Sequence, residues 1–240
     1  MAMGRIHSWE SMGLVDGPGI RTVIFLQGCR LRCRYCHNPD TWELCGGGTL
    51  ESPEETVNRL MRFKPYYGAD GGVTFSGGEP LLQKEFLTEA LALCKSRGIH
   101  TCLDTAGGGC GGYGEILKNT DLVLLDVKHY TPEGYQAVTS RSMDAYEEFL
   151  DAVQSMEVPL WLRHVVVPGL TDGEDHLAGL AEYVKGIRNV KRVELLPYHV
   201  LGVPKYRAMG IPYPLEGVPP MESGALVKWQ ERMNCGLKNG

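Results

Sequence analysis

The stretch Ile20–Gln27 (IRTVIFLQ) runs directly into the stretch Gly28–His37 (GCRLRCRYCH). The first stretch is rich in β-branched and aromatic residues, which is typical of a strand. The second stretch carries three cysteines, Cys29, Cys33 and Cys36, in the spacing C-x3-C-x2-C. Clustered cysteines of this kind indicate metal ligands, so we expect a metal site in the loop that follows a strand.

Short apolar runs separated by helical patterns follow along the chain. We expect further strands at Val73–Phe75, Ile99–Leu103, Leu122–Val127, Leu160–Val167 and Arg192–Leu196. Helical spacing is found at Glu54–Phe63, between Gly78 and Lys95, and at Tyr146–Met156, His176–Gly186 and Glu222–Met233. The segment before Ile20 is interpreted as a polar start without a strand or helix. Strands that alternate with helices imply a parallel α/β sheet with helical crossovers. Because we count six such units where a closed barrel has eight, we expect an open, partial (β/α)6 barrel of the TIM-barrel type.

The bulk composition is that of a globular protein: the chain has 240 residues, of which 43% are hydrophobic and 22% charged. No repeat or low-complexity linker divides it, so we expect a single domain, 1–240, with a core of about 15–200 and a C-terminal extension of about 201–240. The net charge of −5 and the lack of a long Lys/Arg run argue against nucleic acid as a partner. The sequence has no apolar run long enough to span a membrane and no secretory signal, so we expect no membrane partner and a cytoplasmic location.

Polar and glycine residues cluster directly after the apolar runs. In parallel α/β proteins the carboxyl ends of the strands form the ligand-binding face, so these residues are expected to meet at one site. The alternative is that each cluster only marks a turn. The clusters are Cys29–Cys36, Ser76–Glu79, Asp104–Thr105, Asp126–Lys128 and His199.

The spacing of the cysteines allows one loop to wrap three thiolates around an iron–sulfur cube. Three ligands suit a [4Fe–4S] cluster in which one iron stays open for a small molecule, because a fourth cysteine would close the site. Zinc is the main alternative, with His37 as a fourth ligand, although structural zinc sites often use two separate C-x2-C pairs and His37 directly follows Cys36. An accidental spacing is the remaining alternative. The scattered Cys45, Cys94, Cys102, Cys110 and Cys235 are expected to be ordinary unpaired thiols.

Three arginines, Arg30, Arg32 and Arg34, alternate through the cysteine loop. Cations beside an anionic cluster would favour its reduction and attract an acidic electron donor. Equally, they are explained as the solvated long side chains of a turn.

Seven segments resemble those of the glycyl-radical-enzyme activating enzymes of the radical SAM superfamily, in the same order and from about Gly4 to Tyr206. They are VDGPGIR (Val15–Arg21), YCHNPDTW (Tyr35–Trp42), SGGEP (Ser76–Pro80), LDT (Leu103–Thr105), LDVK (Leu125–Lys128), VVVPG (Val165–Gly169) and LLPYH (Leu195–His199). This resemblance implies a partial (β/α)6 barrel that binds a [4Fe–4S] cluster through Cys29, Cys33 and Cys36, with S-adenosyl-L-methionine at the open iron. It further implies that one electron splits S-adenosyl-L-methionine into methionine and a 5′-deoxyadenosyl radical, and that this radical removes a hydrogen atom from a glycine of a partner enzyme.

The resemblance also implies which residues contact S-adenosyl-L-methionine. The backbone at Gly77 and Gly78 can approach the methionyl amine closely because glycine has no side chain. Asp126 and Lys128 have the charges that suit the ammonium and carboxylate groups or the ribose hydroxyls of the cofactor. The other expected contacts come from Tyr35, Cys36, His37, Glu79, Asp104, Thr105, Val127 and His199.

Several of these acidic residues have a second interpretation. Glu79 either offers its carboxylate to the amine or braces the end of a strand. The resemblance implies that Asp104, Thr105 and Asp126 also hold a monovalent cation. Interpreted alone, Asp104 and Asp126 are typical strand-end acids bonded to backbone amides.

Two further residues complete the expected site. Asp16 is expected at the mouth where the substrate enters and is assigned to catalysis, and Arg163 is expected to contact the carboxylate of the cofactor or the substrate peptide. A turn role for Asp16 and a position at the rim of the core for Arg163 are the alternatives.

The expected partners are a glycyl radical enzyme and a flavodoxin-like or ferredoxin-like electron donor. Related activating enzymes often carry extra clusters between the first motif and the GGE segment, where this chain has only Cys45. That difference favours a partner of the pyruvate formate-lyase type. Three segments depart from the family pattern. Thr105-Ala106-Gly107 stands in place of TNG, Gly107–Gly112 is rich in glycine, and Val138-Thr139-Ser140 stands in place of a glycine-containing turn. The alternatives are a radical SAM enzyme that acts on a small molecule and a non-enzymatic iron–sulfur or zinc module.

Overall fold

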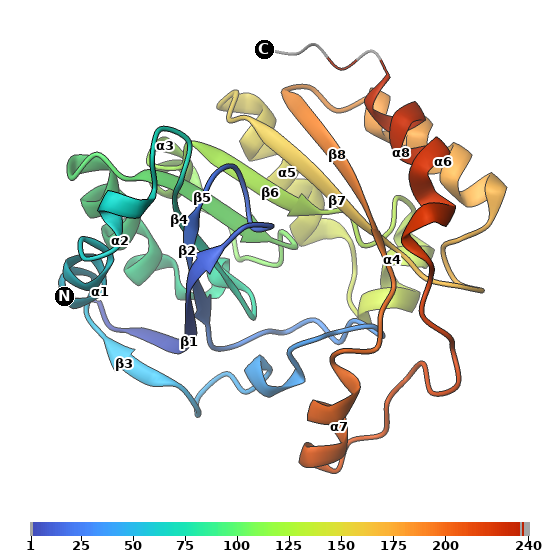
Figure 1. Cartoon of the computed structure of the whole chain (residues 1–240), viewed down its shortest axis with the longest axis horizontal. Coiled ribbons are helices and arrows are strands. Elements are labelled where there is room, and N and C mark those ends of the chain that lie inside the picture. Colours follow the sequence, from blue (N-terminus) through green and yellow to red (C-terminus); the bar gives the residue numbers. More distant parts are fainter. Residues whose placement is uncertain (1, 236, 238–240) are drawn as a thin grey trace. The chain divides into compact units, whose positions relative to one another are not determined.

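The structure is a computed structural model and describes residues 2–235 and 237. Its strands are β1 Gly4–Gly13, β2 Arg21–Leu26, β3 Thr49–Glu51, β4 Gly72–Gly77, β5 His100–Thr105, β6 Leu122–Asp126, β7 Leu160–Val166 and β8 Val190–Pro197. They form one sheet in the order β3-β1-β2-β4-β5-β6-β7-β8, which leaves β3 and β8 as edges, so the sheet does not close (Figure 1). The pairs β2–β4, β4–β5 and β7–β8 are parallel. The prediction of an α/β fold with an open, partial barrel is confirmed.

The six predicted strands correspond to β2 and β4 to β8. The strands β1 and β3 were not expected: β1 pairs antiparallel with both β2 and β3. The sequence of β1, GRIHSWESMG, has few consecutive apolar residues, and only Gly4, Ile6 and Gly13 in it are buried. A strand at the side of a sheet that faces solvent does not need a continuous apolar run, which is why the segment was misinterpreted as a polar start.

The chain divides into two compact units. The first unit comprises the residues up to Arg30, Thr41–Leu124 and Asp144–Val158, and the second comprises Leu31–Asp40, Leu125–Met143 and the chain from Pro159 onward. The predicted single domain remains a prediction. Residues 236 and 238–240 of the predicted C-terminal extension lie outside the described residues.

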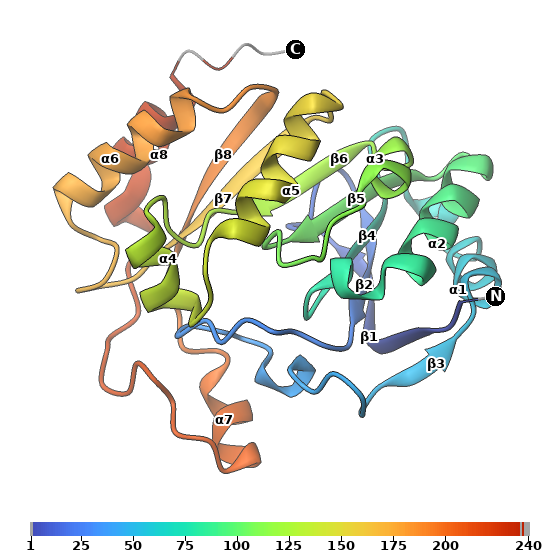
Figure 2. The same cartoon turned by 180° about the vertical axis from the view of Figure 1, so that it is seen from behind.

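The first unit contains the helices α1 Pro53–Leu60, α2 Lys84–Ser96, α3 Gly114–Lys118 and α5 Asp144–Ser155, and the 3-10 turns Lys64–Tyr66 and Pro80–Gln83. Helix α1 begins at Ser52, whose hydroxyl accepts from the amide of Glu55 while the Glu55 carboxylate accepts from the amide of Ser52. This capping box satisfies amides that would otherwise lack a partner at the helix start. The helices α1 and α2 lie side by side (Figure 2).

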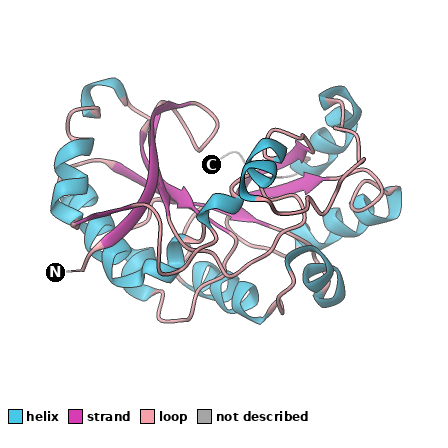
Figure 3. Ribbon diagram, turned by 90° about the horizontal axis from the view of Figure 1, so that it is seen from below, coloured by secondary structure: helices cyan, strands magenta, loops and turns pink. Residues whose placement is uncertain are grey.

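The second unit contains α4 Pro132–Thr139, α6 Glu174–Lys185, α7 Val203–Met209 and α8 Val227–Asn234, with a 3-10 turn at Ser223–Leu226. A further 3-10 turn, Pro39–Thr41, begins in the second unit, and its last residue, Thr41, belongs to the first. Helix α8 packs on the edge strand β8. Figure 3 distinguishes the helices, strands and loops by colour. The side chains of Gln230 and Asn234 bind the backbone of Val193 and Leu195, which protects that part of the edge from pairing with another strand. Among the described residues, none of the helices combines the length and the apolar character needed to cross a bilayer.

Candidate functional site

The cysteine loop is fixed by backbone hydrogen bonds in both units. In the first unit, the amide of Gly28 donates to the carbonyl of Thr41 over 2.8 Å. In the second unit, the amides of Arg32 and Arg34 donate to carbonyls in the last turn of α4, at 2.8 and 3.0 Å. Helix α4 was not expected from the sequence, so this support of the loop could not be predicted.

The three thiols belong to different units: Cys29 to the first, and Cys33 and Cys36 to the second. Cys29 and Cys33 are buried and Cys36 is half-buried, and none of the eight cysteines forms a disulfide. Burial raises the pKa of Cys33 to about 11, so a metal must displace a proton to bind this thiol. Within residues 2–235 and 237, no three His, Cys, Asp or Glu side chains are gathered as a metal site, and ligation by the cysteines remains a prediction.

Glycines in the first unit bring two backbone segments into direct contact. A Cβ at Gly78 would lie 2.3 Å from the carbonyl oxygen of Gly28, and a Cβ at Gly77 would lie 2.2 Å from the amide nitrogen of Leu26. Gly77 also has a φ of 114°, which other residues rarely adopt. The GG pair therefore packs flat against the start of the cysteine loop, where any side chain would force the segments apart.

The carboxylate of Glu79 is buried at the end of β4, and only 1% of this residue is exposed. One oxygen accepts from the Thr105 hydroxyl at 2.5 Å and the Leu81 amide at 3.2 Å. The other oxygen accepts from the amides of Ala106 and Gly108, both at 3.1 Å. Burial raises the pKa of Glu79, and the four donors oppose that effect. These contacts correspond to the bracing role that the sequence offered as an alternative, and the cofactor contact of Glu79 remains a prediction.

The ends of β4 and β5 also bring Ser76 and Asp104 together. The Ser76 hydroxyl donates to Asp104 Oδ2 over 2.7 Å. The hydroxyl of Thr105, next to Asp104, donates to the Glu79 carboxylate and accepts from the amide of Gly107. The structure thus brings the polar residues after β4 and β5 together, and the single site expected for all five clusters remains a prediction.

In the second unit, Asp126 and Lys128 form an ion pair at the end of β6. Lys128 Nζ lies 2.7 Å from Asp126 Oδ2 and 5.6 Å from the centre of the Tyr35 ring. Burial, the largest single influence, lowers the pKa of Lys128, but the charge and hydrogen bond of Asp126 act together with Cys33 and Tyr35 and raise it well above the ordinary value. A charged pair therefore lies beside Tyr35, the aromatic residue between Cys33 and Cys36.

His37 and His199 stack in the second unit, with ring centres 4.0 Å apart. His37 Nε2 donates to the backbone oxygen of His199 over 3.2 Å, and burial lowers the pKa of His37 to about 4. Two buried polar atoms, His199 Nδ1 and the Tyr35 hydroxyl, have no hydrogen-bond partner among the described residues. Buried atoms of this kind need a partner, and a bound polar ligand would supply one.

Asp16 is half-buried in the first unit, and Arg163 lies on β7 in the second. The backbone oxygen of Asp16 accepts from the Thr74 hydroxyl at 2.6 Å, and the same hydroxyl accepts from Arg21 Nε at 2.7 Å. Arg163 Nε lies 3.1 Å from a carboxylate oxygen of Glu194 on the neighbouring strand. Sequence reasoning missed Arg21 as a residue that supports the site, although an arginine at the start of an apolar strand was a visible signal.

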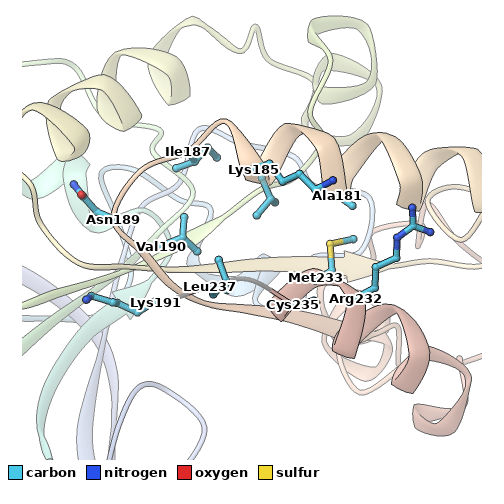
Figure 4. Close-up of a pocket in the computed structure, with 11 residues that line it drawn as sticks. Ala181, Lys185, Ile187, Asn189, Val190, Lys191, Arg232, Met233, Cys235 and Leu237 are labelled. Atoms are coloured by element: carbon cyan, nitrogen blue, oxygen red, sulfur yellow. The ribbon is translucent and has the colours of Figure 1, made fainter. Parts of the chain in front are cut away.

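The sequence-predicted residues thus fall into two groups. Those of the first unit are Asp16, Cys29, Gly77, Gly78, Glu79, Asp104 and Thr105. Those of the second unit are Cys33, Tyr35, Cys36, His37, Asp126, Val127, Lys128, Arg163 and His199. Within each unit the structure joins several of them by hydrogen bonds, ring contacts or ion pairs. A cavity of about 640 Å³ between α6, β8 and α8 is lined by none of them (Figure 4).

The chain is similar to known proteins over most of its length. The model of the Radical SAM superfamily matches residues 23–181. The pyruvate formate-lyase-activating enzyme of Clostridium pasteurianum is 57% identical over 223 residues, which cover 92% of this chain and 93% of that protein. The enzyme of the same name from Listeria monocytogenes is 46% identical over 224 residues, 90% of each chain. Among solved structures, a domain of a pyruvate-formate lyase-activating enzyme from Bacteroides vulgatus has a TM-score of 0.56 at 25% identity and covers 70% of this chain and 96% of that one.

Proposed function

We propose that this chain, which belongs to the radical SAM superfamily and within it to the family of the pyruvate formate-lyase-activating enzymes, activates a glycyl radical enzyme. Its relatives cover nearly the whole chain, so the proposal concerns the complete enzyme activity rather than one module. The protein substrate that the relatives' names indicate is pyruvate formate-lyase. A small-molecule radical SAM enzyme is less well supported, because no relative named above acts on one.

The superfamily implies a [4Fe–4S] cluster and S-adenosyl-L-methionine as cofactors. When bound, they would supply one-electron cleavage of a carbon–sulfur bond of S-adenosyl-L-methionine, coupled to removal of a hydrogen atom from a glycine Cα, with methionine and 5′-deoxyadenosine as products. Cys29, Cys33 and Cys36 would hold the cluster. They fit this group because three thiolates leave one iron open.

The residues of the second unit fit a zwitterionic ligand. Asp126 would bind an ammonium or ribose hydroxyls, and Lys128 would bind a carboxylate. Tyr35, His37 and His199 offer aromatic surface, and the orphan atoms of Tyr35 and His199 offer hydrogen bonds. In the first unit, Gly77 and Gly78 are half-buried beside the start of the cysteine loop, and their backbone would approach the methionyl amine.

Three finer features belong to the same proposal. Asp104, Thr105 and Asp126 supply hard oxygen ligands of the kind that a monovalent cation takes. Arg30 and Arg32 are exposed on the cysteine loop and suit an acidic flavodoxin-like or ferredoxin-like electron donor. A cytoplasmic location suits eight cysteines without a disulfide, all of which lie within the described range 2–235.

The observation that carries the proposal is the charged pair Asp126–Lys128 beside Tyr35, because a pair of opposite charges next to the cysteine loop suits a zwitterionic ligand. The test is anaerobic reconstitution with iron and sulfide, followed by reduction and assay of 5′-deoxyadenosine with and without pyruvate formate-lyase. We expect 5′-deoxyadenosine and an electron paramagnetic resonance signal of a glycyl radical. Both should be lost in Cys33→Ala and kept in Cys94→Ala, which removes a buried thiol of α2.

Each contrary outcome has a distinct meaning. A full cluster without 5′-deoxyadenosine would indicate an electron-transfer module. 5′-Deoxyadenosine without a glycyl radical in the partner would indicate another substrate, and bound zinc in place of iron would overturn the proposal.

A further inference from the structure

A group of three histidines in the second unit contacts the backbone between Asp126 and Lys128 through its member His164. His164 on β7 is 2% exposed, and His176 is in the first turn of α6. Their Nε2 atoms are 3.2 Å apart. The ring of His129 lies 4.8 Å from that of His176. The activity proposed above assigns no role to any of the three.

The hydrogen bonds fix the protonation of His164. Its Nδ1 lies 2.7 Å from the carbonyl oxygen of Val127, and a carbonyl can only accept, so Nδ1 carries the hydrogen. A neutral imidazole then has an acceptor at Nε2, and His176 must donate from its own Nε2. Burial, first of all, lowers the pKa of His164 to about 3, in agreement with a neutral ring.

His129 does not compete for this bond. Its Nδ1 accepts from the backbone amide of Thr131 at 3.1 Å. With His176 it makes a ring contact, and the chain of hydrogen bonds runs from His176 through His164 to Val127.

Val127 is the residue between the two members of the charged pair. Its carbonyl is held by His164, and its amide donates to the carbonyl of Arg163 over 2.8 Å. Two consecutive residues of β7 thus hold both polar groups of the Val127 backbone. The positions of Asp126 and Lys128, one on each side, depend on these bonds.

We propose that His164 is a positioning residue for S-adenosyl-L-methionine: oriented by His176, it holds the carbonyl of Val127 and so fixes Asp126 and Lys128 at the distance the cofactor requires. This inference rests on the proposed function, because it assigns the cofactor to that pair. It goes beyond that function by giving the buried histidines a role in binding rather than in packing alone.

The test separates the two nitrogens of His164. In His164→Asn the amide can reach the position of Nδ1 and donate to Val127, whereas in His164→Gln it reaches the position of Nε2 and faces His176. We measure the dissociation constant for S-adenosyl-L-methionine on the reconstituted enzyme, together with iron content and the melting temperature. The loss of a hydrogen bond to a buried carbonyl should raise the constant about tenfold in His164→Gln, and at most about threefold in His164→Asn.

A second pair of variants applies the same logic to the outer histidine. His176→Gln keeps a donor near the position of Nε2, and His176→Leu removes it. We expect the Leu variant to weaken cofactor binding more than the Gln variant at equal iron content. Nitrogen NMR of the unreconstituted protein should show the Nδ1–H tautomer of His164.

An Nε2–H tautomer, or equal constants for the Asn and Gln variants of His164, would overturn the inference. If every His164 variant fails to fold, the inference is tested by cofactor binding in His176→Gln and His176→Leu and by the tautomer of His164. A wild-type protein that holds its cluster but binds no S-adenosyl-L-methionine would overturn the proposed function, and the inference with it. A wild type that makes 5′-deoxyadenosine, with variants that bind like the wild type, would overturn the inference alone.

Discussion

Arg21 Nε donates a hydrogen bond of 2.7 Å to the hydroxyl of Thr74, and both residues are completely buried. The guanidinium also donates to the backbone oxygens of Pro18, Val73 and His100. The Thr74 hydroxyl in turn donates a hydrogen bond to the backbone oxygen of Asp16. A single buried side chain therefore holds the VDGPGIR loop onto the sheet of the first unit.

Arg21→Lys should lower the free energy of unfolding by about 2–4 kcal/mol, because an ammonium group cannot satisfy the same set of buried acceptors as the planar guanidinium. Denaturation in urea measures this change. Arg62→Lys, at an exposed position, is the control and should change stability by less than about 0.5 kcal/mol. Equal stability of the two variants would show that the buried network contributes little.

Glu79→Gln tests the bracing role of the carboxylate. An amide group has only one acceptor oxygen where the structure presents four donors, so one or two buried donors lose their partner. We expect a loss of about 2–4 kcal/mol in unfolding free energy. Glu89→Gln on the exposed face of α2 is the matched control. A Glu79→Gln protein as stable as the wild type would leave the cofactor contact as the better explanation of this residue.

Ser140 ends α4 in the left-handed conformation, with φ 61° and ψ 24°. Glycine adopts this conformation without steric cost, and the family pattern has a glycine in this turn. Ser140→Gly should therefore stabilise the protein by about 0.5–1 kcal/mol, and Ser140→Ala should not. Urea denaturation of both variants gives the comparison. A destabilised Gly variant would mean that the serine hydroxyl makes a contribution larger than the strain.

Stability should fall as the pH decreases from about 6.5 toward 4. Burial lowers the pKa of His37 and of His176 to about 4, below the 6.5 of the unfolded chain. The unfolded state therefore binds protons first, and each histidine contributes stability above pH 6.5 that is lost as the pH falls toward its folded pKa. Among the neighbours of His176, which include His164 and Tyr130, His129 lowers its pKa further and Asp172 raises it.

The corresponding measurement is urea denaturation of wild type and His176→Gln at several pH values between about 7.5 and 5, a range that includes the histidine pKa of the unfolded chain. The stability of the wild type should fall more steeply than that of the variant between pH 6.5 and 5, by at most about 1 kcal/mol per pH unit, because one proton corresponds to about 1.4 kcal/mol and the partial exposure of His176 reduces the effect. Parallel slopes would show that His176 is protonated equally in the folded and unfolded chains.

The sequence predicted those parts of the structure that depend on local pattern. Each strand with a continuous apolar run was found, because burial on both faces demands such a run. Strand β1 was missed because its exposed residues interrupt the pattern. The contact of His164 with Val127 could not be predicted at all, since it depends on how β7 lies against the end of β6, and residues 37 positions apart carry no periodic signal. Glu79 is an intermediate case: both of its roles were visible in the sequence, the structure shows the four donors of the bracing role, and the cofactor contact remains a prediction.

Arg32 is exposed on the cysteine loop, and its charge is the last feature that can be tested separately. Arg32→Glu should slow reduction of the cluster by a flavodoxin several-fold at low ionic strength, because an acidic donor is no longer attracted. The difference from wild type should shrink in 0.5 M salt, where the Debye length is only about 4 Å. Arg62→Glu, which carries the same charge change on another exposed segment of the first unit, is the control. Reduction rates that are equal for both variants at every salt concentration would mean that the loop arginines are solvated turn residues with no role in docking.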